Sequence, residues 1–160
     1  MLSRLMMALL ALQAAGSLAA QGADWLALCE RGALAEQACI GALAERCMID
    51  DGARTTFMAG PCFGDEAAMW QARLDAAMTG IGAAAALASD WAAQVGWPDP
   101  QPTLARVAAE AFAAHRAAAC DMEGALWGNG AGAGETWAEC RMQVTAQQAV
   151  RLESRVEVTR

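Results

Sequence analysis

The residues best suited to covalent chemistry in this sequence are six cysteines, and their spacing favours disulfides over a metal site. No two of them form a Cys-x-x-Cys pair, and His115 is the only histidine. Structural zinc sites and haem attachment use closer Cys and His spacings. Since an even number of cysteines in an exported chain is typical of a disulfide framework, we expect three disulfides. The cysteines are Cys29, Cys39, Cys47, Cys62, Cys120 and Cys140.

No pattern in the sequence predicts a catalytic or cofactor-binding site. A nucleophile needs a base within hydrogen-bond reach and a group that orients that base. His115 is expected on the apolar face of a helix, where a packed or half-buried role is the better interpretation. The acidic pairs at 50–51 and 65–66 do not fit a calcium loop and are expected to face water or cap backbone amides. The glycine turn at 128–134 lacks the lysine of a phosphate loop. We therefore expect no enzyme activity, no metal and no cofactor.

Arg116 has two interpretations. It lies one helical turn before Cys120, where a buried guanidinium would satisfy carbonyls or pair with Glu110 or Glu123 and so fix a helix hairpin. It would equally suit a ligand that carries a negative charge. Because arginine commonly makes such multi-donor contacts inside proteins, we favour the structural role.

These residues must be positioned by helices, because alanine is abundant and β-branched residues are sparse. Gly60-Pro61 is expected to interrupt the chain, and Asp65 or Glu66 to start the best-formed helix. Its apolar side chains from Met69 to Ile81 repeat at helical spacing. Gly80 and Gly82 are expected to kink or end it, unless it continues to about Val95. Shorter helices are predicted after Asp24, around residues 40–47, from Thr103 to Leu126 and from Glu135 to Leu152, with a C-terminal tail that frays.

The last two predicted helices form an antiparallel hairpin, which suggests one disulfide directly. The turn at 128–134 brings the end of one helix opposite the start of the next, so Cys120 and Cys140 face each other. Fifteen pairings of six cysteines are possible. Of these we favour Cys120–Cys140 together with the local pairs Cys29–Cys39 and Cys47–Cys62.

The N-terminus has the pattern of a secretory signal peptide. Arg4 precedes an apolar run at residues 5–12, and small residues follow up to Ala20. We place cleavage after Ala19; a cut after Ala20 fits almost as well. Gln13 interrupts the apolar run too early for a membrane anchor, which needs ~20 apolar residues. Residues 1–19 are thus predicted to be removed, and residues 20–160 to fold as a single helical domain with no stable membrane insertion.

The charge balance excludes some partners. Acidic residues outnumber basic ones by 18 to 11, and every basic side chain other than the histidine is an arginine. Nucleic acids and anionic membrane surfaces attract basic proteins, so neither is an expected partner. A basic protein partner is compatible with this charge, although solubility alone is a common cause of it.

Two segments carry a shared set of motifs. In the C-terminal half the residues are Phe112, His115-Arg116, Cys120, Glu123, Trp127, Cys140, Thr145-Ala146 and Leu152. In the N-terminal half they are Cys39-Ile40-Gly41, Cys47, Cys62, Glu66, Trp70, Arg73-Leu74-Asp75 and Met78. Together these segments resemble the LprI-like lysozyme-inhibitor family, much of which carries only a label of unknown function. This chain departs from the family at four positions: relatives carry Tyr at His115, Asn at Asp75, Arg at Gln148 and an aromatic residue at Met78.

The resemblance implies a periplasmic or envelope protein of helical architecture, and one branch of the family is taken to inhibit lysozyme. We therefore expect a binding protein for a lysozyme-type cell-wall hydrolase or another basic envelope protein. An acidic, rigid domain would be steered towards such enzymes, which are generally basic. The segments 50–56 and 128–134 are the candidate inhibitory loops. The alternative is a structural or envelope-assembly protein, which exposed tryptophans would support, although core packing is expected to account for most of the six.

Overall fold

The computed structural model shows a helical protein with a long central helix. The signal peptide predicted at residues 1–19 and most of the loop predicted at 50–56 lie outside the residues that the structure describes. None of the described helices combines the length and the apolar character needed to cross a bilayer. The described residues are 24, 26–32, 36–50, 56–101, 103, 107–128, 130 and 132–158.

No strand occurs in this described part of the chain, which confirms the all-α fold predicted from the sequence. Residues 26–32 are helical and precede the first labelled element. The elements that follow are η1 (Glu36–Cys39), α2 (Ala42–Asp50), α3 (Thr56–Val95), the π-helical η2 (Val107–Ala111), α5 (Phe112–Leu126) and α6 (Ala133–Val158).

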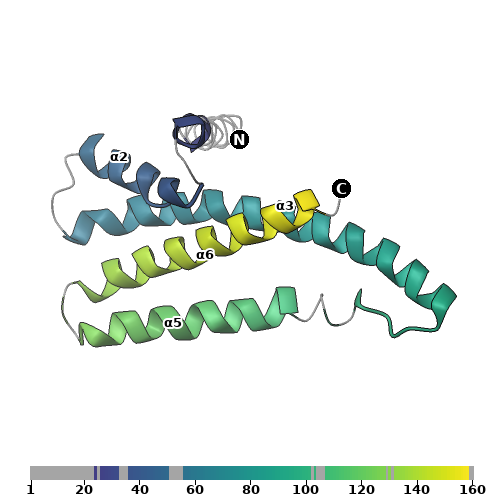
Figure 1. Ribbon diagram of the computed structural model, residues 1–160. Coiled ribbons are helices and arrows are strands. Elements are labelled where there is room, and N and C mark those ends of the chain that lie inside the picture. Colours follow the sequence, from purple (N-terminus) through teal and green to yellow (C-terminus); the bar gives the residue numbers. More distant parts are fainter. Residues whose placement is uncertain are drawn as a thin grey trace, which may run out of the picture.

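The helix α6 lies between α3 and α5, and α2 packs on the other side of α3 (Figure 1). The main core forms where α3 meets α6. Trp70 and Leu74 of α3 are buried against Met142, Ala146 and Ala149 of α6. Because the alanines on α6 have short side chains, the indole of Trp70 is fully buried between the two helices.

The helix α3 begins at Thr56, so the expected start at Asp65 or Glu66 and the expected break at Gly60-Pro61 are both wrong. Pro61 lies inside the helix, in its second turn, where the missing N–H costs one backbone hydrogen bond. Its neighbours Cys62 and Phe63 are buried in the core, and Cys62 is bonded to Cys47. This tertiary burial outweighs the local preference of Gly-Pro for a turn.

Gly80 and Gly82 do not end the helix either. A Cβ atom at Gly80 would lie 3.0 Å from Val156 Cγ1, so the glycine allows α6 to approach α3 closely. The same contact favours helix as far as Val158, within the tail of residues 156–160 that was expected to fray. At Gly82 nothing lies within 4 Å of such a Cβ atom, and no packing reason for that glycine is visible.

The helix α3 ends at Val95, the later of the two ends that the sequence left open, through a glycine cap. Gly96 has a φ of 74°, a left-handed conformation that favours glycine. The N–H of Trp97 then donates to the carbonyl of Ala92 at 2.8 Å, which is the Schellman hydrogen bond that closes many helices. The last turns of α3 extend beyond the ends of α5 and α6 (Figure 1).

Candidate functional site

The structure joins the same cysteines that the sequence analysis favours: Cys29–Cys39, Cys47–Cys62 and Cys120–Cys140. The first ties the N-terminal helical segment to η1, the second ties α2 to α3, and the third closes the α5–α6 hairpin. All six sulfur atoms are thus committed to structure, and none is available as a nucleophile or metal ligand.

Two of the residues that carry the family resemblance, Glu66 and Trp70, form a buried polar centre. The carboxylate of Glu66 accepts hydrogen bonds from the backbone N–H of Gly41 and of Ala44, both at 2.7 Å, and from Trp70 Nε1 at 2.8 Å. Gly41 and Ala44 lie at the N-terminus of α2, so a side chain of α3 caps another helix. Glu66 is fully buried and every acceptor contact is internal, so its role is structural.

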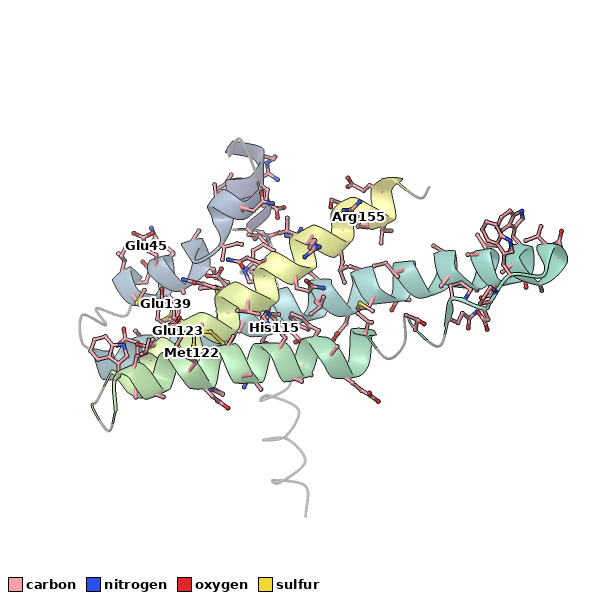
Figure 2. The ribbon with its side chains drawn as sticks, turned by 60° about the horizontal axis from the view of Figure 1, so that its bottom comes forward. Glu45, His115, Met122, Glu123, Glu139 and Arg155 are labelled. Carbon is pink, nitrogen blue, oxygen red and sulfur yellow. A yellow bond between two sulfur atoms is a disulfide. The ribbon has the colours of Figure 1, made fainter. Side chains whose placement is uncertain are left out.

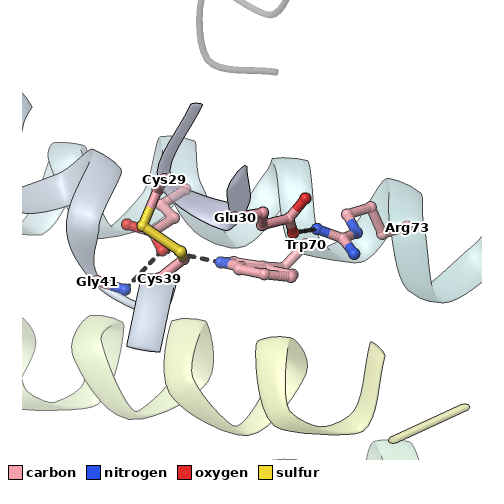
Figure 3. Close-up of a disulfide and its surroundings, with 7 residues drawn as sticks. Cys29, Glu30, Cys39, Gly41, Trp70 and Arg73 are labelled. Carbon is pink, nitrogen blue, oxygen red and sulfur yellow. Dashed lines mark hydrogen bonds and ion pairs between the residues drawn. A yellow bond between two sulfur atoms is a disulfide. The ribbon is translucent and has the colours of Figure 1, made fainter. Parts of the chain in front are cut away.

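Arg73 extends this centre. Its guanidinium forms a two-pronged pair with Glu153 of α6, through Nε at 2.8 Å and Nη2 at 2.5 Å, and a further ion pair with Glu30. It also lies 4.7 Å from the ring centre of Trp70. Burial lowers the pKa of Arg73, but the hydrogen bonds and charges of Glu153 and Glu30 outweigh it and raise the pKa overall. Figure 3 shows Arg73 facing Glu30 close to the Cys29–Cys39 disulfide.

Arg116 pairs with neither Glu110 nor Glu123, which corrects the prediction from the sequence. Its Nη1 donates to Oε1 of Gln71 at 2.7 Å and to Oγ1 of Thr145 at 3.0 Å. The guanidinium thereby connects α5 to both α3 and α6. The two glutamates lie on α5 itself or just before it, whereas the half-buried Arg116 side chain extends to the neighbouring helices.

Arg116 also lines a half-open pocket of about 310 Å³ formed by α3, η2, α5 and α6. Most of its wall is apolar, and the polar groups are Gln71, Asp75, Gln148 and Arg116 itself. Burial, followed by the nearby charge of Arg141, lowers the pKa of Arg116, while the carboxylate of Asp75 opposes that effect. The apolar wall consists of Leu74, Met78, Ile81, Val107, Phe112, Ala113 and Leu152.

Glu123 and Trp127, the remaining residues of the resemblance, lie at the other end of α5, in the hairpin tip, which we define as residues 121–139. Trp127 is 57% exposed, and its ring packs over Gly132, where a Cβ atom would lie 2.8 Å from Trp127 Cε3. Trp137 donates from Nε1 to Asp121 at 3.0 Å, and Arg141 lies 4.7 Å from its ring centre. Both indoles are partly exposed but held in place.

The hairpin tip also carries a concentrated negative charge. No arginine occurs between residues 117 and 140, whereas Asp121, Glu123, Glu135 and Glu139 all lie there. Glu123 and Glu139 line a shallow groove of about 410 Å³ between α5 and α6, next to the exposed Met122. Figure 2 shows Met122, Glu123 and Glu139 at one end of the molecule and Arg155 well away from them.

His115 is exposed, so the expected packed or half-buried position is wrong. The inward positions of α5 are Phe112, Arg116 and Cys120, at intervals of one helical turn, and His115 lies about 100° away from Arg116 around the helix. In the part of the chain that the structure describes, no group of three or more His, Cys, Asp or Glu side chains could hold a metal ion.

The residues that the sequence singled out therefore separate into three places. Glu66 and Trp70 are in the core, Arg116 is in the pocket, and Glu123 and Trp127 are at the hairpin tip. Sequence reasoning missed the polar partners of Arg116. Thr145 stood in the resemblance only as part of a Thr-Ala run, and nothing marked Gln71.

The chain matches no protein-family model, no curated protein and no solved structure. The LprI-like resemblance accordingly stays a prediction from the sequence.

Proposed function

We propose that this chain is an exported protein-binding domain whose hairpin tip binds a basic protein, and that lysozyme-type cell-wall hydrolases are its target class. One observation carries the proposal: two fixed, exposed tryptophans lie among four carboxylates, which outnumber the neighbouring Arg141 that stacks on Trp137. The predicted absence of catalysis is part of the same proposal.

The disulfides support the exported location. All six cysteines are paired, and such bonds persist in oxidising compartments, whereas cytosolic reductants keep most thiols reduced. The predicted signal peptide at residues 1–19 agrees with that location. In bacteria an exported protein of this kind would lie in the periplasm.

The tryptophans supply the affinity in this proposal. Indoles are enriched among the residues that dominate binding energies, particularly when they enter a pocket of the partner. Trp127 is held over Gly132, and Trp137 is held by Asp121 and Arg141, so little side-chain freedom is lost on binding. Leu126, at 76% exposure, adds an apolar neighbour to Trp127.

The carboxylates supply partner selection. Like charges would repel an acidic protein, and opposite charges speed the encounter with a basic one. The segment 128–134 was one of two candidate loops from the sequence, and its position between Trp127 and Trp137 favours it.

The test is a cell-wall lysis assay with the oxidised domain and c-type, g-type and i-type lysozymes. We expect dose-dependent inhibition of at least one type that weakens as salt is raised. Trp127→Ala should weaken inhibition about tenfold or more, as interface tryptophans do when truncated. Trp97→Ala is the matched control, because Trp97 is also exposed but lies beyond the end of α3.

A charge series completes the design. The double variant Glu123→Gln and Glu139→Gln removes two charges from the tip, and the double variant Asp90→Asn and Glu157→Gln removes two charges elsewhere. The first should reduce inhibition and its salt dependence, and the second should not. The proposed target class is wrong if no lysozyme is inhibited at large excess, or if both double variants behave alike.

A second candidate function has its own observation. Leu87, Trp91 and Trp97 are exposed at the far end of α3, where the two indoles meet edge to face with ring centres 4.9 Å apart. The core does not account for these tryptophans, contrary to the expectation that packing explains most of them. An envelope-assembly role would use this end, and Trp91→Ala would then abolish co-purification with an envelope protein while Trp127→Ala would leave it intact.

A further inference from the structure

The pocket beside Arg116 combines an apolar wall with one charged group. Leu74, Met78 and Ile81 come from α3, Phe112 from α5 and Leu152 from α6. Ligand sites of about this size are typically apolar, with few polar groups that fix orientation. The wall would therefore accommodate a hydrocarbon body better than a sugar or a nucleotide.

Arg116 supplies unsatisfied hydrogen-bond donors. A guanidinium has five N–H donors, and both of its hydrogen bonds to described residues leave from Nη1. The acceptors, Gln71 and Thr145, are neutral, and no described carboxylate forms an ion pair with Arg116. The Nε–Nη2 edge thus keeps the geometry that carboxylates bind with two parallel hydrogen bonds.

Arg116 stays protonated although burial disfavours its charged form. Desolvation lowers the pKa of Arg116, and the neighbouring Arg141 adds to that effect, yet an arginine stays protonated at pH 7. A buried or half-buried cation is stabilised by an anion that replaces lost water. An anionic ligand head would provide that compensation.

Asp75 also lines the pocket, and its carboxylate would repel an anion. Its Oδ1 accepts a hydrogen bond from Gln71 Nε2 at 2.8 Å, and the side chain is exposed to solvent, which screens its charge. Arg116 is the more buried of the two, so its field inside the pocket is the less screened. Arg116 therefore determines the sign of the electrostatic potential inside the pocket, and Asp75 is a weaker opposing charge.

The segment that precedes α5 has an unusual helical conformation. Residues Val107–Ala111 form a π-helical turn; its first residue, Val107, and the residue after it, Phe112, both line the pocket. Such turns cost stability within a helix and occur frequently at functional sites. Val107 of this turn adds an apolar side chain to the pocket wall.

From these observations we propose that the pocket binds a single-chain amphiphile with a carboxylate head, the head on Arg116 and the chain against Met78, Ile81 and Leu152. The volume of about 310 Å³ is that of roughly ten water molecules at ~30 Å³ each, so the half-open pocket has room for most of a short single-chain amphiphile. This site is separate from the hairpin tip, and the inference does not depend on a lysozyme target.

The test is isothermal titration of the oxidised chain with decanoate at pH 7, below its micelle concentration. Decyltrimethylammonium is the matched probe with the same chain and the opposite charge. We expect saturable binding of one decanoate per chain and none of the cation. Arg116→Gln should weaken decanoate binding about tenfold or more, because a hydrogen bond to a charged group is lost.

Two further variants and a control make the outcome decisive. Asp75→Asn should tighten decanoate binding, and Arg155→Gln, an exposed arginine away from the pocket, should leave it unchanged. Should Arg116→Gln lose its helical circular dichroism, Ala113→Trp serves instead, since it fills the pocket from an exposed position. The proposal is overturned if wild type does not bind decanoate, if the cation binds in its place, or if binding survives both Arg116→Gln and Ala113→Trp.

Discussion

Replacing Glu66 tests whether a buried carboxylate on α3 holds α2 in place. Gly41 directly precedes α2, and its lack of a side chain leaves the usual N-terminal cap without a capping group. The Glu66 carboxylate takes that role, since it accepts from the N–H groups of Gly41 and Ala44 at 2.7 Å. Its negative charge also suits a helix N-terminus.

The size of the effect follows from the hydrogen bonds. In Glu66→Gln, the amide oxygen can still accept from Gly41 and Trp70, but the new NH₂ group faces the N–H of Ala44. One buried donor then lacks an acceptor and the remaining bonds lose their charge, so we expect a loss of about 2–4 kcal/mol in the free energy of unfolding. Glu66→Ala leaves three donors unpaired and opens a cavity, so the expected loss is about 5 kcal/mol or more.

The assay is equilibrium unfolding in guanidinium chloride, followed by far-ultraviolet circular dichroism with all disulfides intact. Asp65→Asn is the matched control, because Asp65 is the exposed neighbour on the same helix. Amide exchange at Ala44 should also accelerate in Glu66→Gln. A Glu66→Gln variant within about 0.5 kcal/mol of Asp65→Asn would refute the argument, since surface changes normally fall in that range.

Three further outcomes are expected. Gly82→Ala should raise the free energy of unfolding by about 0.5–1 kcal/mol, because the new Cβ meets open space. Gly80→Leu should lower the free energy of unfolding by about 1–3 kcal/mol, because the larger side chain clashes with Val156. Chemical unfolding measures both. Replacing both cysteines of the α5–α6 disulfide with alanine should cost about 3 kcal/mol, given the sequence separation of 20. Hydrogen bonds from Ser89 and, second, from the backbone N–H of Gln101 lower the pKa of Asp99. Ser89→Ala should therefore raise the pKa of Asp99, as measured by an NMR titration. The stability that this carboxylate adds is present at neutral pH and is lost as pH falls through its folded-state pKa.

Local signals in the sequence predicted the features that depend on neighbouring residues. Gly96 follows the last turn of α3 and caps it, so the end at Val95 was predictable. The glycine-rich turn at 128–134 indicated the antiparallel hairpin and hence the Cys120–Cys140 pair. In each case the residues that determine the structure lie close together in the chain.

Long-range packing explains what the sequence did not predict. The chain stays helical through Gly60-Pro61 because Cys62 and Phe63 are buried and because Cys62 is bonded to Cys47, 15 residues earlier. The acceptors of Arg116 lie 45 and 29 residues away, on two other helices. No periodicity within α5 indicates which residues of α3 and α6 will face it.

The same limit applies to the two candidate sites. The pocket takes its wall from three α-helices and a π-helical turn, so it becomes visible only when these are packed together. The acidic stretch of the hairpin tip could be counted in the sequence, but the exposure of Trp127 and Trp137 could not. A tryptophan at helical spacing is equally compatible with a core position.

The way in which the arginines are paired explains how an acidic chain can attract a cation at one place and an anion at another. Arg73 is neutralised by Glu30 and Glu153, so it contributes little field at the surface. Arg116 is half-buried and hydrogen-bonded to neutral groups, so its charge acts on the pocket. The tip carries four carboxylates that act together over distances near the Debye length, about 10 Å at 0.1 M salt. Raising the salt concentration should therefore weaken binding at the tip far more than binding in the pocket, because contact in the pocket is direct and partly shielded from ions. One salt series measured with both lysozyme and decanoate would separate the two sites.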